Sequence, residues 1–85
     1  MTMGITKTAY EKTKKVYETA AYYRDVAPKM YKADDFIGEL IPIAEFLCQA
    51  GKDSLSDFMY RKCNEILIMF GETPVFWDSR CRLLK

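Results

Sequence analysis

The stretch that decides the fold is FIGELIPIAEFLCQAG, residues 36–51. Its polar positions form only a narrow strip, and nearly every other residue is apolar. A helix that is apolar most of the way round belongs in the middle of a bundle, where neighbouring helices cover it. We therefore expect a central helix that begins at Asp34 or Asp35, both good capping residues. We expect four residues of this helix to be buried, namely Leu40, Ile43, Ala44 and Leu47.

Two residues in this stretch interrupt the helical pattern. Pro42 has no amide hydrogen, and its ring clashes with the carbonyl of the preceding turn, so it must kink the helix or split it. Gly51 suits the left-handed conformation that commonly follows a last helical turn. The stretch therefore predicts a central helix that is kinked or split at Pro42 and ends before Gly51.

The residues before this stretch predict a first helix. Thr8 and Glu11 have the spacing of a capping box, in which each side chain satisfies a free amide of the first turn. The helical pattern runs from there to Ala27, and Pro28 ends it. Its alanine, valine and tyrosine residues repeat at helical spacing and form one face, with charged residues on the other.

The residues after the central stretch predict two more helices. The third opens at Ser54, with Asp57 three residues later as a second capping box, and closes at Gly71. The fourth covers residues 73–85, because it starts with a threonine in the capping position and a proline at the first helical position.

The fold class follows from these segments. No alternating strand pattern of useful length occurs, so we expect an all-α protein, a small bundle of about four helices. A chain of 85 residues allows one domain, which we place at residues 1–85 with a flexible N-terminus at about residues 1–5.

Composition favours self-association. The chain is 49% hydrophobic and 14% aromatic. A domain this small buries only somewhat over ~60% of the surface that its unfolded chain exposes. Apolar residues are therefore plentiful for so little interior, and we expect a homo-oligomer or a protein partner to cover part of them.

The charges are segregated along the chain although the formal net charge is only +1. Residues 1–32 carry seven Lys or Arg against three Asp or Glu, and residues 58–85 carry five against three. Residues 33–57, in contrast, carry one lysine against six acidic residues. An acidic middle between basic ends first suggests complementarity within the molecule, and it also permits a basic outer face.

Several classes of chemistry are excluded by composition. The chain contains no histidine, so Ser/His and Cys/His nucleophiles are impossible. The cysteines Cys48, Cys63 and Cys81 are widely spaced and lack the paired ligands of a structural zinc site. No glycine-rich phosphate loop occurs. We therefore expect no enzyme, no catalytic residue, no metal site and no cofactor.

The same residues bear on the cellular compartment. Three cysteines, an odd number without a CxxC motif, are expected to be reduced thiols. The opening residues MTMGITKTAY contain no apolar leader, and the longest apolar run, ILIMF, is far shorter than the ~20 residues of a membrane span. We expect a cytoplasmic protein without a membrane contact.

The stretch FWDSRCRLL, residues 76–84, contains the most unusual cation. On a helix, Arg80 would have aromatic residues one turn before it and leucines one turn after it. In the structural interpretation its stem packs on the aromatics and its guanidinium meets a carboxylate such as Glu39 or Glu45. In the functional interpretation it binds an anion or a partner, with stacking from Trp77. The structural interpretation is the simpler one.

Other residues join Arg80 as candidates for binding a partner or an anion. Arg24 and Lys62 also lie on apolar faces, and tyrosine and arginine are enriched at interface hot spots. The alternative is a nucleic-acid face on the first helix, or a helix-turn-helix at residues 65–85. The partner or anion candidates are Tyr22, Arg24, Lys62, Trp77, Arg80 and Arg82, and the nucleic-acid candidates are Lys12, Lys14 and Lys15.

The function that fits these observations is protein binding without catalysis. We expect a small helical interaction module, acting as a self-associating regulator, an adaptor or an inhibitor of the kind that viral and mobile-element genomes encode. The alternative is a protein that binds nucleic acid or a small phosphorylated ligand through basic residues of the first and last helices. Ionic strength distinguishes the two, because affinity for phosphate falls steeply with salt.

Overall fold

In the computed structural model, the helix of residues 53–69 contacts all three other helices and is the central one, where we expected the split helix of residues 34–49. The structure describes the backbone of residues 3–77 and 83–84, and the side chains of residues 7–77. This part of the chain confirms the all-α fold, a small bundle of four helices. The elements are α1 (Met3–Val26), α2 (Asp34–Ile37), α3 (Ile41–Gln49), α4 (Asp53–Met69) and the strands β1 (Phe76–Trp77) and β2 (Leu83–Leu84).

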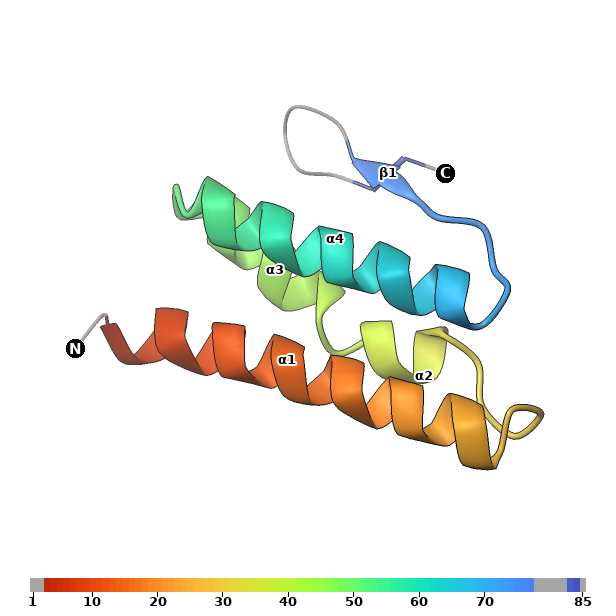
Figure 1. Cartoon of the computed structure of the whole chain (residues 1–85). Coiled ribbons are helices and arrows are strands. Elements are labelled where there is room, and N and C mark those ends of the chain that lie inside the picture. The colour runs from red at the N-terminus through yellow and green to blue at the C-terminus, as the bar shows by residue number, and fades with distance from the viewer. Residues whose placement is uncertain (1–2, 78–82, 85) are drawn as a thin grey trace.

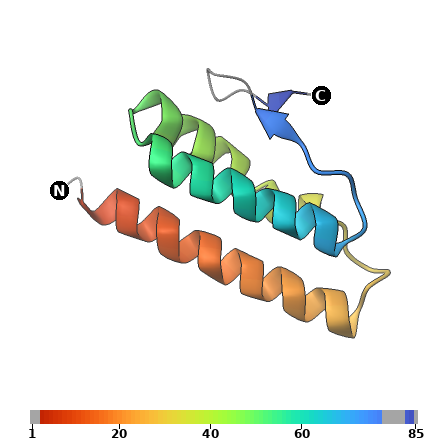
Figure 2. The same ribbon diagram turned by 45° about the horizontal axis from the view of Figure 1, so that its top comes forward.

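Three helices lie side by side. In Figures 1 and 2, α1 and α4 run in the same direction, and α3 runs opposite to both. The most extensive contacts join α3 to α4 and α1 to α4, whereas α1 makes no comparably close backbone contact with α3. The molecule is flat, with principal extents of 38 × 29 × 14 Å. Few side chains can be fully enclosed in such a shape.

The interruption of the central helix is confirmed. Helix α2 ends at Ile37, and α3 begins at Ile41 with Pro42 in its first turn, where a missing amide hydrogen costs nothing. Helix α2 contributes Ile37, the turn between the two pieces contributes Leu40, and α3 contributes Ala44 and Leu47 to the buried core. Ile43, which we expected to be buried, is only partly buried.

The predicted glycine ends of two helices are confirmed. Gly51 and Gly71 have φ angles of 83° and 75°, a region that favours glycine. After α3, the amide of Lys52 donates to the carbonyl of Leu47 at 2.8 Å, which is the 6→1 hydrogen bond of a Schellman motif. The equivalent bond after α4 runs from the amide of Glu72 to the carbonyl of Leu67 at 2.8 Å.

The predicted helix starts are less accurate. Helix α1 begins at Met3, so Thr8 lies inside it instead of capping it. Helix α4 begins at Asp53 after Lys52, with no capping hydrogen bond from a side chain, so the box predicted at Ser54 does not form. A helix that has nucleated extends at little cost, and a local cap signal therefore does not set its first residue.

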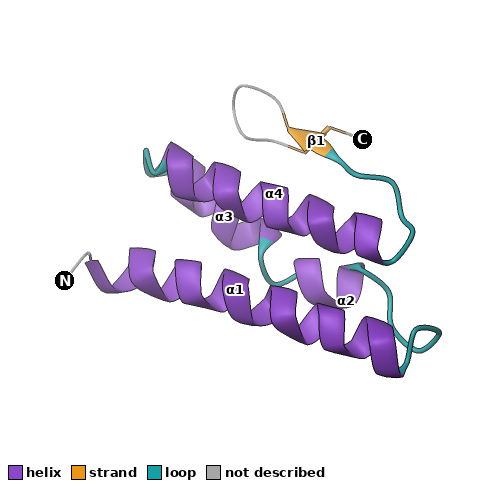
Figure 3. Ribbon diagram, viewed as in Figure 1, coloured by secondary structure: helices purple, strands orange, loops and turns teal. Residues whose placement is uncertain are grey.

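The predicted fourth helix is wrong. Residues 73–75 contain no helix, and Phe76–Trp77 pairs antiparallel with Leu83–Leu84, as the orange segment in Figure 3 shows. The side chain of Asn64 donates to the carbonyl of Val75 at 2.8 Å and accepts from its amide at 2.9 Å. The Trp77 ring stacks on Tyr60 with centroids 4.8 Å apart. These contacts hold the segment extended against α4, so the helix-turn-helix alternative is also wrong.

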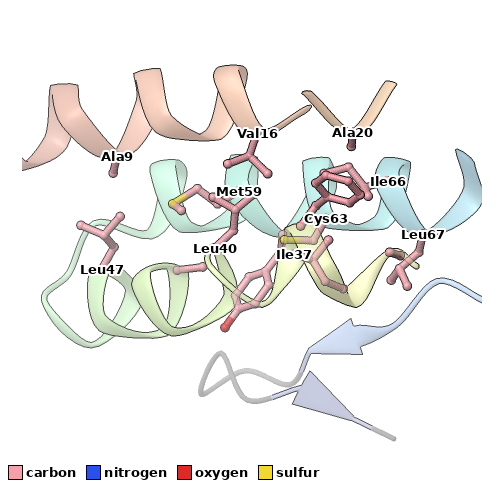
Figure 4. Close-up of a cluster of buried hydrophobic side chains, with 14 residues drawn as sticks. Ala9, Val16, Ala20, Ile37, Leu40, Leu47, Met59, Cys63, Ile66 and Leu67 are labelled. Carbon is pink, nitrogen blue, oxygen red and sulfur yellow. The ribbon is translucent and has the colours of Figure 1, made fainter. Parts of the chain in front are cut away.

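The hydrophobic core lies where α1 meets the other helices. Figure 4 shows Ala9, Val16 and Ala20 of α1 facing Met59, Cys63 and Ile66 of α4. Two of these α1 residues are alanines, which allow the backbone of α1 to approach α4 closely. Buried polar groups are satisfied: the hydroxyl of Ser56 donates to the carbonyl of Ala44 at 2.7 Å.

The burial of α3 leads to a stability prediction. Leu47 is 1% exposed, so Leu47→Ala should lower the free energy of unfolding by about 2–5 kcal/mol through lost burial and a residual cavity. Urea unfolding followed by circular dichroism measures this change. Lys52→Ala is the control, because Lys52 is exposed. Equal unfolding midpoints for the two variants would contradict the burial of Leu47.

The contact between Asn64 and Val75 leads to a second prediction. Asn64→Ala leaves the part-buried amide and carbonyl of Val75 without their partners, at a cost of about 1–3 kcal/mol. The segment should then leave α4. Trp77 is the only tryptophan of the chain, so its emission should shift to the red as it loses Tyr60. Thr73→Ala is the control in the same segment, and an emission spectrum of Asn64→Ala that matches this control would refute the role of Asn64.

Candidate functional site

The partner or anion candidates from the sequence do not form one cluster among the described residues. Tyr22 and Arg24 lie on the last turns of α1, and Arg24 forms an ion pair with its neighbour Asp25 at 3.1 Å. Trp77 lies on the extended segment and stacks on Tyr60. Arg80 and Arg82 lie outside the described residues.

Lys62 is engaged within the molecule. Its Nζ lies 4.6 Å from the ring centroid of Tyr17 and 5.9 Å from that of Phe58. The same ammonium is 3.4 Å from the carboxylate of Glu65. Since its side chain is only 28% exposed, the contacts with these aromatic rings are partly shielded from water. Lys62 therefore joins α4 to α1.

The three lysines of the expected nucleic-acid face have different neighbours. Lys12 forms an ion pair with Glu39 at 3.6 Å, on the side of α1 that faces α2. Lys14 lies over the ring of Tyr10 at 5.2 Å, on the side that faces α4. Lys15 is exposed and has no ion pair among the described residues. Lys15 lines one hollow with Lys12 and Glu39 and a second with Lys14, Glu11 and Glu18, so acidic residues interrupt the basic surface.

Aromatic and basic side chains meet along the line where α1 contacts α4. The rings of Tyr10 and Phe58 stack with centroids 5.1 Å apart, between Lys14 on one helix and Lys62 on the other. We call this set of residues the α1–α4 seam, namely Tyr10, Lys14, Tyr17, Phe58 and Lys62. Its two cations are attracted to rings of the same cluster, which stabilises the contact between the helices.

A second aromatic cluster accounts for several of the tyrosines. The rings of Tyr23 and Tyr31 lie 4.6 Å apart, and Phe36 stacks on Phe70 at 5.6 Å and contacts Tyr31 at 5.8 Å. Tyr60 is buried in the core. The abundance of tyrosine that suggested an interface is therefore partly explained by internal packing.

The opposite side of α1 carries an open apolar groove. It lies between α1 and α3 and has a volume of about 340 Å³. Its lining is almost wholly apolar, and Phe46 remains 56% exposed at its edge. We call it the α1–α3 groove, and its lining residues are Thr8, Ala9, Lys12, Pro42, Ile43 and Phe46.

A second hollow continues the groove along α1. Its volume is about 250 Å³, and Lys12 lines both depressions. The ion pair between Lys12 and Glu39 stands between the apolar groove and this more polar hollow. We call it the central hollow, and its lining residues are Lys12, Lys15, Val16, Thr19, Phe36 and Glu39.

Sequence reasoning did not identify Phe46 as a surface residue. It treated the central helix as buried nearly all round, and Phe46 as part of that apolar surface. One signal was present: Phe46 lies one turn after Pro42 and just after Glu45, at the border of the polar strip. Phe46 is open to solvent because α1 and α3 are not in close contact. This separation depends on long-range contacts that a local sequence pattern does not contain.

The potential metal ligands and the cysteines of the described residues can be placed individually. No group of three or more acidic or sulfur ligands in the described part of the chain could hold a metal ion. Cys48 is disulfide-bonded, so the expectation of three reduced thiols is wrong for it, and Cys81 lies outside the described residues. Cys63 is a free thiol in the core, and burial raises its pKa to about 12. A thiol that stays protonated is a poor nucleophile.

The burial of Cys63 also affects stability at high pH. The folded state favours the protonated thiol, because its pKa rises from 9.0 to about 12 on folding. This contribution to stability is complete below the unfolded pKa and is lost as the pH rises toward the folded value.

Among the described helices, none combines the length and the hydrophobicity that a membrane span requires.

Comparison with known proteins found no match: no protein-family model, no curated protein and no solved structure matches the chain.

The raised pKa of Cys63 leads to a labelling prediction. Iodoacetamide at a mildly alkaline pH should leave Cys63 unmodified in the native protein, because the buried thiol is neither accessible nor ionised. Peptide mass spectrometry measures the modification, and the same reaction in concentrated guanidinium chloride supplies the positive control. Modification of native Cys63 at the rate of the denatured chain would show that the core opens readily around it.

Proposed function

We propose that this protein is a small non-enzymatic helical interaction module that binds a protein partner in the α1–α3 groove. The observation that carries the proposal is the apolar groove of about 340 Å³ with Phe46 exposed at its edge. Large aromatic side chains at such surfaces are frequent anchors of protein interfaces. A role as regulator, adaptor or inhibitor fits the size of the chain and its lack of histidine.

The character of the groove favours a protein over a small ligand. Sites for small molecules combine an enclosed apolar pocket with a few polar groups that orient the ligand. The α1–α3 groove is open, and Lys12 and Thr8 at its rim are its polar side chains. Apolar side chains of a partner need no such orientation, and they gain free energy by leaving water together with Phe46 and Ile43.

The alternative function, binding of nucleic acid or a phosphorylated ligand, has weaker support. Lys12 is paired with Glu39, and Lys14 and Lys62 are attracted to rings of the α1–α4 seam. An anion would have to compete with these partners for the cations. Glu65, which contacts Lys62, would also repel it.

Photocrosslinking tests the proposed function. A benzophenone amino acid at position 46 should form protein adducts in the native cells, because this position borders the groove. The same group at position 68 is the matched control, since Ile68 is 59% exposed on α4 and Phe46 is 56% exposed on α3. Protease should remove the adducts, whereas nuclease should not.

A second variant tests whether the adduct at position 46 forms in the α1–α3 groove. Thr8 is exposed on the wall opposite Phe46, so Thr8→Arg should obstruct the groove without disturbing the core and should abolish the adduct at position 46. Equal adducts at positions 46 and 68 would refute a specific protein site. Adducts sensitive to nuclease would instead establish the alternative function.

A further inference from the structure

The extended segment after α4 is held on that helix as a bound peptide would be. In Figures 1 and 2, it lies on the side of α4 that is turned away from α1. The side chain of Asn64 forms two hydrogen bonds with the backbone of Val75, and the Tyr60 ring stacks on Trp77. Among the described residues, residues 73–77 form no backbone hydrogen bond with a helix. Side chains of α4 make these contacts, which do not require the segment to be continuous with α4.

Asn64 recognises the backbone of the segment. Its Nδ2 donates to the carbonyl of Val75 at 2.8 Å, and its Oδ1 accepts from the amide of the same residue at 2.9 Å. A neighbouring strand would offer the same donor and acceptor. Every residue except proline carries both backbone groups, so this contact does not depend on the side chain at position 75.

The spacing of Tyr60 and Asn64 matches that of an extended chain. The two residues lie one turn apart on α4, about 6 Å along its axis. Alternate residues of an extended chain lie about 6.6 Å apart, so one turn of α4 can meet both Val75 and Trp77. The side chains of Val75 and Trp77 pack against the core, whereas Phe76 between them is 68% exposed. The arrangement therefore selects an apolar residue and, two positions later, an aromatic residue.

We propose that this side of α4 binds an extended peptide segment of a partner protein, and that residues 73–77 occupy the site in cis as an autoinhibitory strap. The partner segment carries the pattern of Val75 and Trp77, an apolar residue followed two positions later by an aromatic residue. Its backbone pairs with Asn64, and its aromatic ring stacks on Tyr60. The site lies apart from the α1–α3 groove and does not depend on the proposed function.

Glu72 allows the strap to leave without loosening α4. Its amide donates to the carbonyl of Leu67 at 2.8 Å, and its carboxylate accepts from the amide of Ala33 at 2.9 Å. The end of α4 is therefore fixed before the strap begins. Beyond Glu72, β1 and β2 pair over only two residues each, and a two-stranded hairpin is marginally stable by itself. The strap thus relies on its few contacts with α4, which is typical of segments that open locally.

The strap and the partner segment compete for the same surface. Tyr60 is 1% exposed, so departure of Trp77 would bring part of an aromatic ring into water. The aromatic residue of a partner segment would cover it again. Because the strap is part of the same chain, its effective concentration is high, and a partner reaches only the fraction of molecules in which the strap is away.

Peptide binding in trans tests the site. The probe is a fluorescein-labelled synthetic peptide of residues 72–77, and its anisotropy is measured against the full chain. The double variant Val75→Pro with Trp77→Ala removes the cis contacts with Asn64 and Tyr60, so it should bind the peptide saturably. The wild-type chain should bind at least about tenfold more weakly, because its own strap competes. A dithiol reductant is present throughout, so that the disulfide of Cys48 does not restrain the chain.

Backbone recognition by Asn64 is tested with matched peptides and variants. A peptide with a methylated Val75 amide cannot donate to Asn64 and should bind at least about tenfold more weakly. The peptide methylated at Phe76 is the control, because successive amides of an extended chain point to opposite sides. In the double variant, Asn64→Asp should weaken binding similarly, since a carboxylate cannot donate to the carbonyl. Arg61→Ala is its control, because Arg61 is exposed on the same helix.

The outcomes decide the proposal. Absence of saturable binding up to millimolar protein, or loss of the helices from the double variant in circular dichroism, would overturn it. Equal binding by the wild-type chain would overturn the cis strap, and binding that ignores both the methylated Val75 amide and Asn64→Asp would overturn the site. A wild-type dimer in sedimentation equilibrium that Asn64→Asp dissociates would assign the site to the strap of a second copy and overturn the foreign partner.

Discussion

The position of Pro42 is the constraint on which the rest of the structure depends. A helix from Asp34 to Gln49 would need an amide at position 42 to donate to the carbonyl of Gly38, and it would bring the proline ring against that carbonyl. The chain avoids both by breaking between Ile37 and Ile41. The two pieces then take different neighbours: α2 packs between α1 and α4, and α3 packs along α4. One continuous helix could not satisfy both contacts.

The separation between α1 and α3 is a consequence of this break. Helix α2 packs against α1. The first turns of α1 contact α4 through Tyr10 and Phe58, and they leave an open groove toward α3. The two flanks of α1 therefore differ. Toward α4, Tyr10 of α1 stacks on Phe58, and Lys14 of α1 and Lys62 of α4 lie over the rings, whereas toward α3 apolar surface remains open. The groove that we propose as a binding surface arises from an incomplete packing contact, not from a separate structural element.

The C-terminal segment shows how tertiary contacts override local signals. A threonine followed by a proline after Gly71 is a sound start for a helix. A helix there would give up the two hydrogen bonds between Asn64 and Val75 and the stacking of Trp77 on Tyr60. Glu72 adds a further contact, because its carboxylate accepts from the amide of Ala33 at 2.9 Å, at the start of α2. These interactions join residues 11 to 39 positions apart, so no local pattern contains them.

The sequence by itself determined the helical content, the glycine ends after α3 and α4, the interruption at Pro42 and the lack of a histidine-based active site. Each of these depends on the conformational limits of single residues or on composition. Only the tertiary structure decided that Phe46 is exposed, that Lys62 contacts Tyr17 across two helices, and that the chain after Gly71 is extended. These features depend on the distance between helices that are remote in the chain. That distance is set by the side chains packed between them, and helical periodicity alone does not specify it.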